Sequence, residues 1–388
     1  MPGAQIFASF DWYALQGNDL TAIGFNSYRK LLEDLKVIDE SKSAVSSSFF
    51  DSLFVQVNAS ASTSRGEGST LHTYNHLRLL NRQEYLQVLL HTAVARYINA
   101  PPADRGRAAS PGAALRALLG AQFAEALPRL ARYDADAFRD LHLYTEATDR
   151  VLTRHRGLLL ALFNLYAVGD GAIGDALRSR DLLGWDEYQA MIQDLELLDS
   201  QFTQLNMALS FSWSRLRVID ETTERARAKQ LQLSFEDFLE AFSRVASMKA
   251  LPTDEDIRNS NSPDAGGFLL RLRAVPNELS EFLRLRAPAW ENGESLPQPL
   301  NRSIDHLVSY VVRLSAATKA GEGGADGSNS PTKNGGGTVP DGESTATSAS
   351  QTQSKQSSSR LRLISIAVAK FVQAGKSADE KRTSSGVP

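Results

Sequence analysis

FNSYRKLLEDLKVID, at residues 25–39, returns without a gap as WDEYQAMIQDLELLD at residues 185–199. Both segments hold an aromatic residue, a tyrosine three places later and an Asp-Leu pair. Two further motifs also return, Phe10-x-x-Tyr13-Ala14 as Phe163-x-x-Tyr166-Ala167 and Leu80-x-x-x-Glu84-Tyr85-Leu86 as Leu233-x-x-x-Asp237-Phe238-Leu239. Residues 10–98 and 163–251 therefore indicate two copies of one unit, and such a repeat has to be recognised before the fold is argued.

The apolar residues of these segments follow a helical period. Phe25, Tyr28, Leu31, Leu32, Leu35 and Ile38 fall three and four places apart, as do their counterparts in the second copy. We find no alternating segments at the regular spacing that a strand protein would show. The sequence therefore predicts an all-α fold.

Composition excludes several classes of protein. The chain has 388 residues, enough for two cores, and a formal net charge of −3, which does not favour nucleic-acid binding. It has no cysteine, so disulfides, thiolate metal sites and cysteine nucleophiles are excluded. Its most apolar stretch, residues 151–168, contains Arg154, His155 and Arg156. We therefore expect no transmembrane segment, and Met1 to Phe10 do not read as a secretory signal.

The predicted organisation has five parts. Residues 1–100 form a first lobe and residues 146–252 a second, whose entering helix spans Glu146 to Ala167. Residues 101–145 are a linker with a helix over Ala113 to Leu130, and residues 253–318 are a helical extension that includes an amphipathic helix from Leu300 to Leu314. Residues 319–388 are Gly/Ser/Thr-rich and predicted to be disordered, with a short basic amphipathic helix near 360–375 as a possible docking helix.

Four places in the chain share one local pattern: a buried aliphatic residue, three residues, an acid, and an aromatic residue that opens a helix. They begin at Ile23, Leu80, Leu183 and Leu233, with Ser27 in place of the acid in the first. The pattern resembles the second half of an EF-hand loop, with its aliphatic residue at position eight, bidentate acid at position twelve and following aromatic. This resemblance implies two EF-hand-like, calmodulin-like lobes with two hands each.

The loops depart from that family where calcium would bind. In the first hand the early ligand positions fall near Ala14, Gln16 and Asn18. The third hand has Asp170 and Glu187 but extra residues between them. The second loop, residues 58–79, and the fourth, residues 217–232, are too long for a twelve-residue site, and the arginines of the fourth would repel a cation. We expect no cofactor, and Asp170 and Glu187 are the weak calcium candidates.

Degenerate EF-hand pairs with expanded loops resemble helical proteins of cilia and flagella in single-celled eukaryotes. The resemblance implies a non-enzymatic scaffold in the cytoplasm, the cilium or flagellum, or the cytoskeleton, whose partner is a protein helix or an axonemal component. The ten residues expected to line its partner grooves are Phe25, Tyr28, Leu32, Tyr85, Leu89, Trp185, Tyr188, Met191, Phe238 and Phe242. The competing interpretation is that all ten are ordinary residues of the hydrophobic core. A calcium sensor that uses the third hand and a helical enzyme without a recognisable motif are the alternative functions.

Other motifs carry simpler interpretations. Gly169-x-Gly171-x-x-Gly174 lacks the strand that a dinucleotide-binding turn needs, and we interpret it as an expanded loop. His72 and His76 lack a third ligand. The repeated acids Asp34, Asp39, Asp194 and Asp199 lie at matching places on matching helices, which favours capping or a surface pair over catalysis. Arg and Lys residues at 215–229 alternate with acids, as in a salt-bridged helix.

Overall fold

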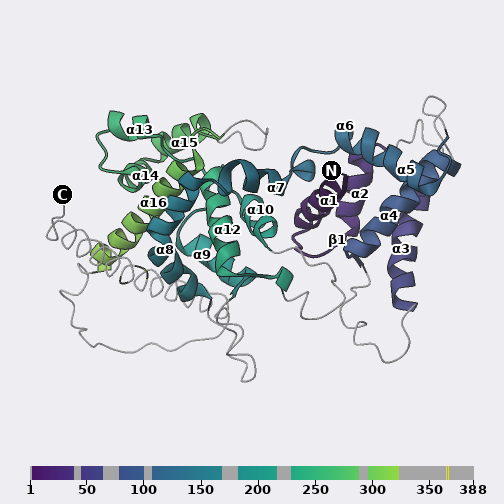
Figure 1. Ribbon diagram of the computed structural model, residues 1–388, viewed down its shortest axis with the longest axis horizontal. Helices are drawn as coiled ribbons and strands as arrows, with labels where there is room; N and C mark the ends of the chain where they lie inside the picture. The colour runs from purple at the N-terminus through teal and green to yellow at the C-terminus, as the bar shows by residue number, and fades with distance from the viewer. Residues whose placement is uncertain are drawn as a thin grey trace, which may run out of the picture. The chain divides into compact units, whose positions relative to one another are not determined.

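The computed structural model describes residues 2–38, 45–63, 78–99, 107–167, 182–215, 229–287 and 296–322, together with Ile364 and Ile366. Helices make up most of this part of the chain (Figure 1), so the prediction of a mainly helical protein is confirmed. None of the described helices has the length and apolar character required to cross a membrane. The tail predicted at 360–375 lies outside the described residues, apart from buried Ile364 and exposed Ile366.

The chain divides into two compact units. Unit 1 contains residues 1–141, 208–231 and 291–294, and unit 2 contains residues 142–207, 232–290 and 295–388. This division counts residues 101–141, which the sequence suggested as a linker, with the first unit. It counts residues 253–290, which the sequence suggested as an extension, with the second.

Each unit has its own set of helices. Those of unit 1 are α1 (Pro2–Gln16), α2 (Phe25–Asp34), α3 (Ser47–Thr63), α4 (Arg82–Val94), the π-helix η2 (Ala95–Asn99), α5 (Pro111–Ala117), the π-helix η3 (Leu118–Phe123), α6 (Ala124–Ala126), the 3-10 turn η4 (Leu130–Arg132) and α7 (Ala135–Phe138). Those of unit 2 are α8 (Glu146–Tyr166), α9 (Trp185–Asp194), α12 (Phe235–Met248), α13 (Asp254–Asn259), α14 (Ala265–Arg273), α15 (Pro276–Leu285) and α16 (Leu300–Glu322). The π-helix η5 (Arg139–Leu143) and α10 (Gln204–Ser214) contain residues of both.

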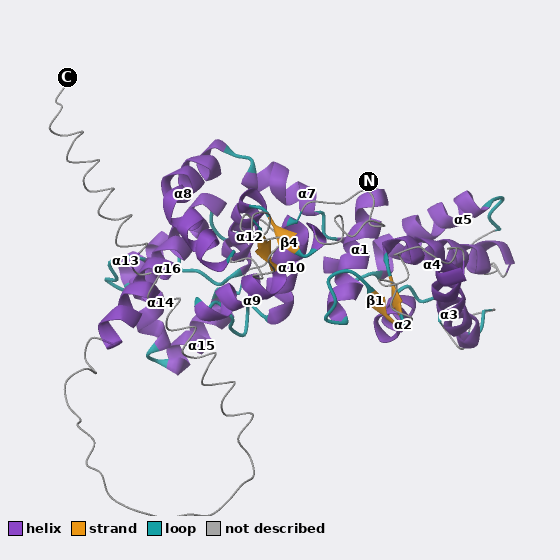
Figure 2. Ribbon diagram, turned by 90° about the horizontal axis from the view of Figure 1, so that it is seen from below, coloured by secondary structure: helices purple, strands orange, loops and turns teal. Residues whose placement is uncertain are grey.

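In each copy, one pair of very short strands joins the two loops (Figure 2). In unit 1, β1 (Ile23–Gly24) pairs antiparallel with β2 (Leu79–Leu80), and Ile23 faces Leu80. In unit 2, β3 (Leu183–Gly184) pairs with β4 (Gln232–Leu233), and Leu183 faces Leu233. Strands of two residues are too short for an alternating pattern, which is why the sequence did not reveal them. The four paired aliphatic residues are those that opened the repeated sequence pattern.

The helices α2 and α9 end in the same way. In each, the residue after the C-cap takes a left-handed conformation, Lys36 with φ 53° and Glu196 with φ 50°. The next backbone N–H then donates back into the last turn, from Val37 to the Leu32 carbonyl and from Leu197 to the Ile192 carbonyl. This is a Schellman motif, a common helix ending. Its occurrence at equivalent positions extends the sequence repeat to the backbone.

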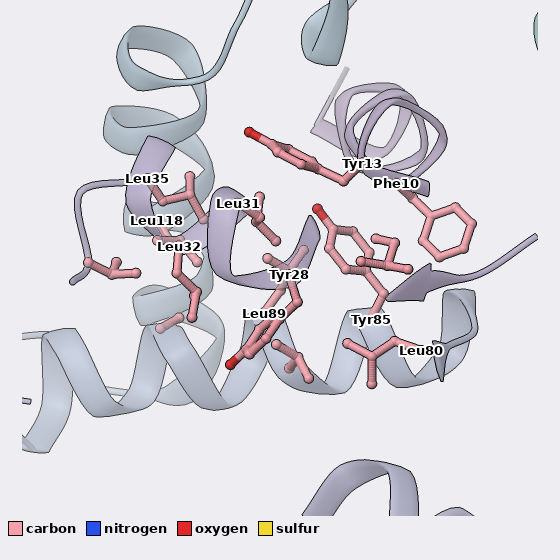
Figure 3. Packing of buried hydrophobic residues seen from close by; sticks show 14 of the residues in the cluster. Phe10, Tyr13, Tyr28, Leu31, Leu32, Leu35, Leu80, Tyr85, Leu89 and Leu118 are labelled. Atoms are coloured by element: carbon pink, nitrogen blue, oxygen red, sulfur yellow. The ribbon is translucent and has the colours of Figure 1, made fainter. Parts of the chain in front are cut away.

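The core of unit 1 takes side chains from α1, α2, α3 and α4, and part of it is shown in Figure 3. Phe10 of α1 packs edge-on against Tyr85 of α4, with ring centroids 5.5 Å apart. The predicted linker helix over Ala113 to Leu130 is interrupted: α5 passes into η3 and α6, and the helix ends before Pro128. Leu118 and Phe123 from this segment belong to the same core, so it is an integral part of unit 1. The predicted entering helix of the second copy is confirmed as α8.

Candidate functional site

The acids that the sequence placed at the twelfth loop position all cap a helix. The backbone N–H of Asn81 donates to Glu84 Oε2 at 2.9 Å, that of Gly184 to Glu187 Oε2 at 2.7 Å, and that of Ser234 to Asp237 Oδ2 at 3.0 Å. A carboxylate at this place satisfies a backbone donor that the first helical turn leaves unpaired. Burial, opposed by the hydrogen bonds from Ser234, raises the pKa of the Asp237 carboxyl. In the structure, these three acids therefore cap the N-termini of the helices that follow the loops.

The first loop has the length of an EF-hand loop but not its ligands. Seven residues back from Ile23 place its first position at Gln16, slightly later than the sequence analysis put it. Instead of a metal ion, Asp19 holds the loop: its Oδ1 accepts the backbone N–H groups of Thr21 at 2.7 Å and Ala22 at 2.9 Å. Ser27, at the twelfth position, is buried. The described first loop is thus a turn closed by the side chain of Asp19.

Of the two weak calcium candidates, the structure describes Glu187 alone. Asp170 lies outside the described residues, as do the glycines 169, 171 and 174, both histidines 72 and 76, and Asp39. Glu187 serves as the capping acid of α9. Within the described ranges, no group of three or more His, Cys, Asp or Glu side chains is arranged to hold a metal ion. The described geometry therefore offers no calcium site.

The ten groove candidates lie in or against the two cores. Eight are buried, and Phe25 and Trp185 are partly buried. Phe25 packs against Phe54 of α3 with ring centroids 5.2 Å apart, and Tyr28 donates its hydroxyl to the Phe50 carbonyl at 3.1 Å. In this conformation these side chains hold helices of their own lobe together.

A segment that follows each lobe in the sequence covers its first and last helices. In unit 1, α5 packs on α4 and η4 packs on α1. In unit 2, α16 packs on both α8 and α12, the helices equivalent to α1 and α4. Each lobe therefore has a cover supplied by its own chain.

The repeated acids have a structural explanation. Tyr13 of α1 donates its hydroxyl to Asp34 Oδ2 at 2.7 Å, and Tyr166 of α8 does the same to Asp194 Oδ2 at 2.8 Å. Burial and the neighbouring Asp34 raise the pKa of the Tyr13 phenol. Asp34 also forms the surface pair that the sequence favours, with Lys30 at 3.0 Å. Asp34 and Asp194 each accept a hydrogen bond from the tyrosine that recurs with them.

Two basic residues, Arg215 and Lys249, are buried and form ion pairs. Arg215 pairs with Asp11 at 3.2 Å and donates to the Gln230 and Leu20 carbonyls. Asp11, on α1, also accepts a hydrogen bond from Arg82 at 2.8 Å. The acids between residues 216 and 228, with which the sequence predicts pairing, lie outside the described residues. Lys249 donates to Asp199 Oδ2 at 2.5 Å, and burial, opposed by Asp199, lowers the pKa of its ammonium group. Long-range ion pairs of this kind leave no local sequence signal.

A group of His–Asp contacts in unit 2 was also missed. His155 of α8 has its Nε2 2.6 Å from Asp305 Oδ1 of α16. His306 of α16, itself buried, lies 3.1 Å from Asp254 Oδ1 of α13. The partners are 150 and 52 residues apart, so only the packed structure reveals them.

Comparison with known proteins adds no relative: no family model, no curated protein and no solved structure matches this chain.

Proposed function

We propose that this chain is a non-enzymatic interaction protein built on two EF-hand-like lobes that hold their shape without calcium. One observation carries the proposal: the paired aliphatic residues Ile23–Leu80 and Leu183–Leu233 join two helix–loop–helix pieces in each copy. The four paired residues are the aliphatic ones that the resemblance places at loop position eight. The repeated Tyr–Asp bonds and Schellman endings support a common origin of the two copies.

The chemistry of the loops supports independence from calcium. In EF-hand sensors, ion binding drives the helices apart and exposes an apolar groove. Here Asp19 closes the first loop, and Glu84, Glu187 and Asp237 cap the helices that follow the other three. The lobes would then be held in one state by packing and capping, and partner binding would not follow a calcium signal. A scaffold at the cilium, flagellum or cytoskeleton remains part of this proposal, and a fluorescent fusion of the full chain would test it.

A calcium titration tests the central claim. Trp185 opens the helix after the third loop, so its emission reports on any ion that orders this loop. We expect no change in tryptophan emission up to about millimolar calcium, the weak end of the EF-hand range. A saturable change that Glu187→Gln abolishes would replace the proposal with a calcium sensor. Proximity labelling in cells, with and without residues 320–388, would recover the partners.

A further inference from the structure

The helix α16 occupies unit 2 in the manner of a bound helical ligand. Six of its apolar side chains recur on one face and are buried: Leu300, Ile304, Leu307, Val308, Val311 and Leu314. They fall at the spacings with which an amphipathic helix fills an apolar groove. The face that they meet belongs to α8 and α12 (Figure 1), the first and last helices of the lobe.

The covers of the two units differ in chemistry. In unit 1 the covering residues that join the core are all apolar: Ala114, Leu118, Leu119, Phe123, Leu127 and Ala131. On α16, three buried residues are polar: Ser303, His306 and Ser315. Permanent interfaces are the more apolar ones, whereas interfaces that exchange retain polar groups. The buried residues of α16 therefore include polar groups, which the buried residues of the described cover of unit 1 do not.

On its other side, α16 is joined closely to α13 and α14. A Cβ at Gly266 of α14 would lie 2.4 Å from the Ser309 carbonyl oxygen, so the two backbones approach too closely for any other residue. Arg313 donates to Asp264 Oδ2 at 2.9 Å, and Arg302 Nε to Asp254 Oδ2 at 3.1 Å. These contacts join α13, α14 and α16 into one cover.

Toward the lobe, one acid of α16 makes polar contacts with α8. Asp305 accepts from His155 at 2.6 Å and from Arg154 at 3.3 Å, both on α8. Its side chain is 18% exposed, so water reaches it once the cover lifts and release leaves no carboxylate stranded in an apolar core. Asp305 directly follows Ile304 of the apolar stripe. The α8 face therefore favours a helix that has an acid at this position in addition to the apolar residues.

We propose that the α8–α12 face of unit 2 is a helix-docking site in which α16 is the resident, exchangeable occupant. The proposal deepens the proposed function, on which it rests, by naming the partner's chemistry. That partner is an amphipathic helix with apolar residues at the spacings of α16 and an acid directly after the second of them. His155 and Arg154 bind this acid, as they bind Asp305 of α16.

Competition in trans tests the partner chemistry. The full chain carrying Asp305→Asn keeps the receptor face intact but weakens the resident helix. A fluorescent peptide of residues 299–317 with the natural acid should then bind this variant about tenfold more tightly than the parent chain, the change expected from losing charge-assisted hydrogen bonds worth about 1.5 kcal/mol. Glu255→Gln removes a charge elsewhere on the cover and should bind the peptide as the parent does. The same peptide with Ile304→Asp should bind neither chain.

Thiol labelling tests the exchange in a chain with a natural Asp305. Because the sequence has no cysteine, one introduced thiol gives an unambiguous signal. Leu307→Cys on α16 and Met191→Cys on α9 replace residues with the same burial, 0% and 1% exposed. The first should react about tenfold faster or more, because a part that opens locally exposes its residues without global unfolding.

Equal labelling rates would mean that α16 leaves only when the whole unit unfolds, and would overturn the proposal. Fast labelling without peptide binding to the Asp305→Asn chain would overturn the assignment of the partner. Neither result affects the calcium titration, so a failure here is distinct from a failure of the proposed function.

Discussion

At the scale of single residues, the tyrosine–aspartate pairs show what the repeated positions do. Tyr13 and Tyr166 sit at the ends of equivalent helices and each donates to an acid on the next helix, Asp34 or Asp194. A hydrogen bond to a carboxylate is among the stronger ones in proteins. Each pair therefore fixes how the first two helices of its copy meet.

Removal of one hydroxyl measures this contact. Tyr13→Phe should lower the free energy of unfolding by about 1.5–3 kcal/mol, because Asp34 loses a partner in a partly buried place. Urea unfolding checks the value. Tyr144→Phe, at an exposed tyrosine, is the matched control and should change stability by less than about 0.5 kcal/mol. Equal effects of the two substitutions would show that the hydroxyl of Tyr13 contributes nothing special.

At the scale of elements, the helix after each loop begins with a carboxylate that turns back to the loop backbone, except for α2, which begins after Gly24 without a side-chain cap. Capping and calcium ligation use the same acid in different ways. A cap needs one acceptor oxygen, whereas a bidentate calcium ligand needs a charged carboxylate. Amide and alanine substitutions at one such position therefore separate the two roles.

For Glu187, we expect the amide to serve as well as the acid. Glu187→Gln keeps an acceptor for the Gly184 N–H, so its unfolding free energy should stay within about 0.5 kcal/mol of the parent value. Glu187→Ala removes the cap and should cost about 0.5–2 kcal/mol. Thermal or urea unfolding in the presence of a chelator gives both numbers. If the amide were as damaging as alanine, the negative charge rather than the cap would be what matters.

At the scale of the whole molecule, several carboxylates in the C-terminal part of unit 2 form ion pairs within that unit. They are Asp254, Asp264 and Asp305. Hydrogen bonds from Arg302 lower the pKa of Asp254. For Asp264 and Asp305 burial raises the pKa, but Arg313 and His155 respectively outweigh it, so both carboxyls also titrate below their usual range. Groups with a lowered folded-state pKa stabilise the fold above their unfolded pKa and lose that contribution as the pH falls through the folded value.

Acid should therefore destabilise this part of the chain first. As the pH falls from about 5 to about 2, we expect the unfolding free energy to fall steadily, because the unfolded chain binds the protons more readily. The double variant Asp254→Asn/Asp264→Asn should be less stable at pH 7 and show a shallower acid slope, while asparagine still caps α14. Glu255→Gln/Glu278→Gln removes two acids from the same region and should retain the parent slope. Urea unfolding at a series of pH values decides between them.

The sequence by itself determined the helical character, the duplication and the four places where helix–loop–helix pieces begin. Those features are written in local spacing: apolar residues three and four apart and an acid three or four residues after an aliphatic one, as at Leu80 and Glu84. It also suggested why calcium is not expected, because ligand types can be counted along a loop.

Only the tertiary structure decided which segment covers each lobe and which charges meet. Nothing local joins His155 to Asp305, 150 residues away, or Arg215 to Asp11, 204 residues away. An amphipathic stripe such as that of α16 states that a helix must bury one face, but not against what, because many apolar faces compete for it with similar energies. The choice is made by loop closure and by the fit of particular side chains, such as the absence of a Cβ at Gly266, and these are properties of the folded whole.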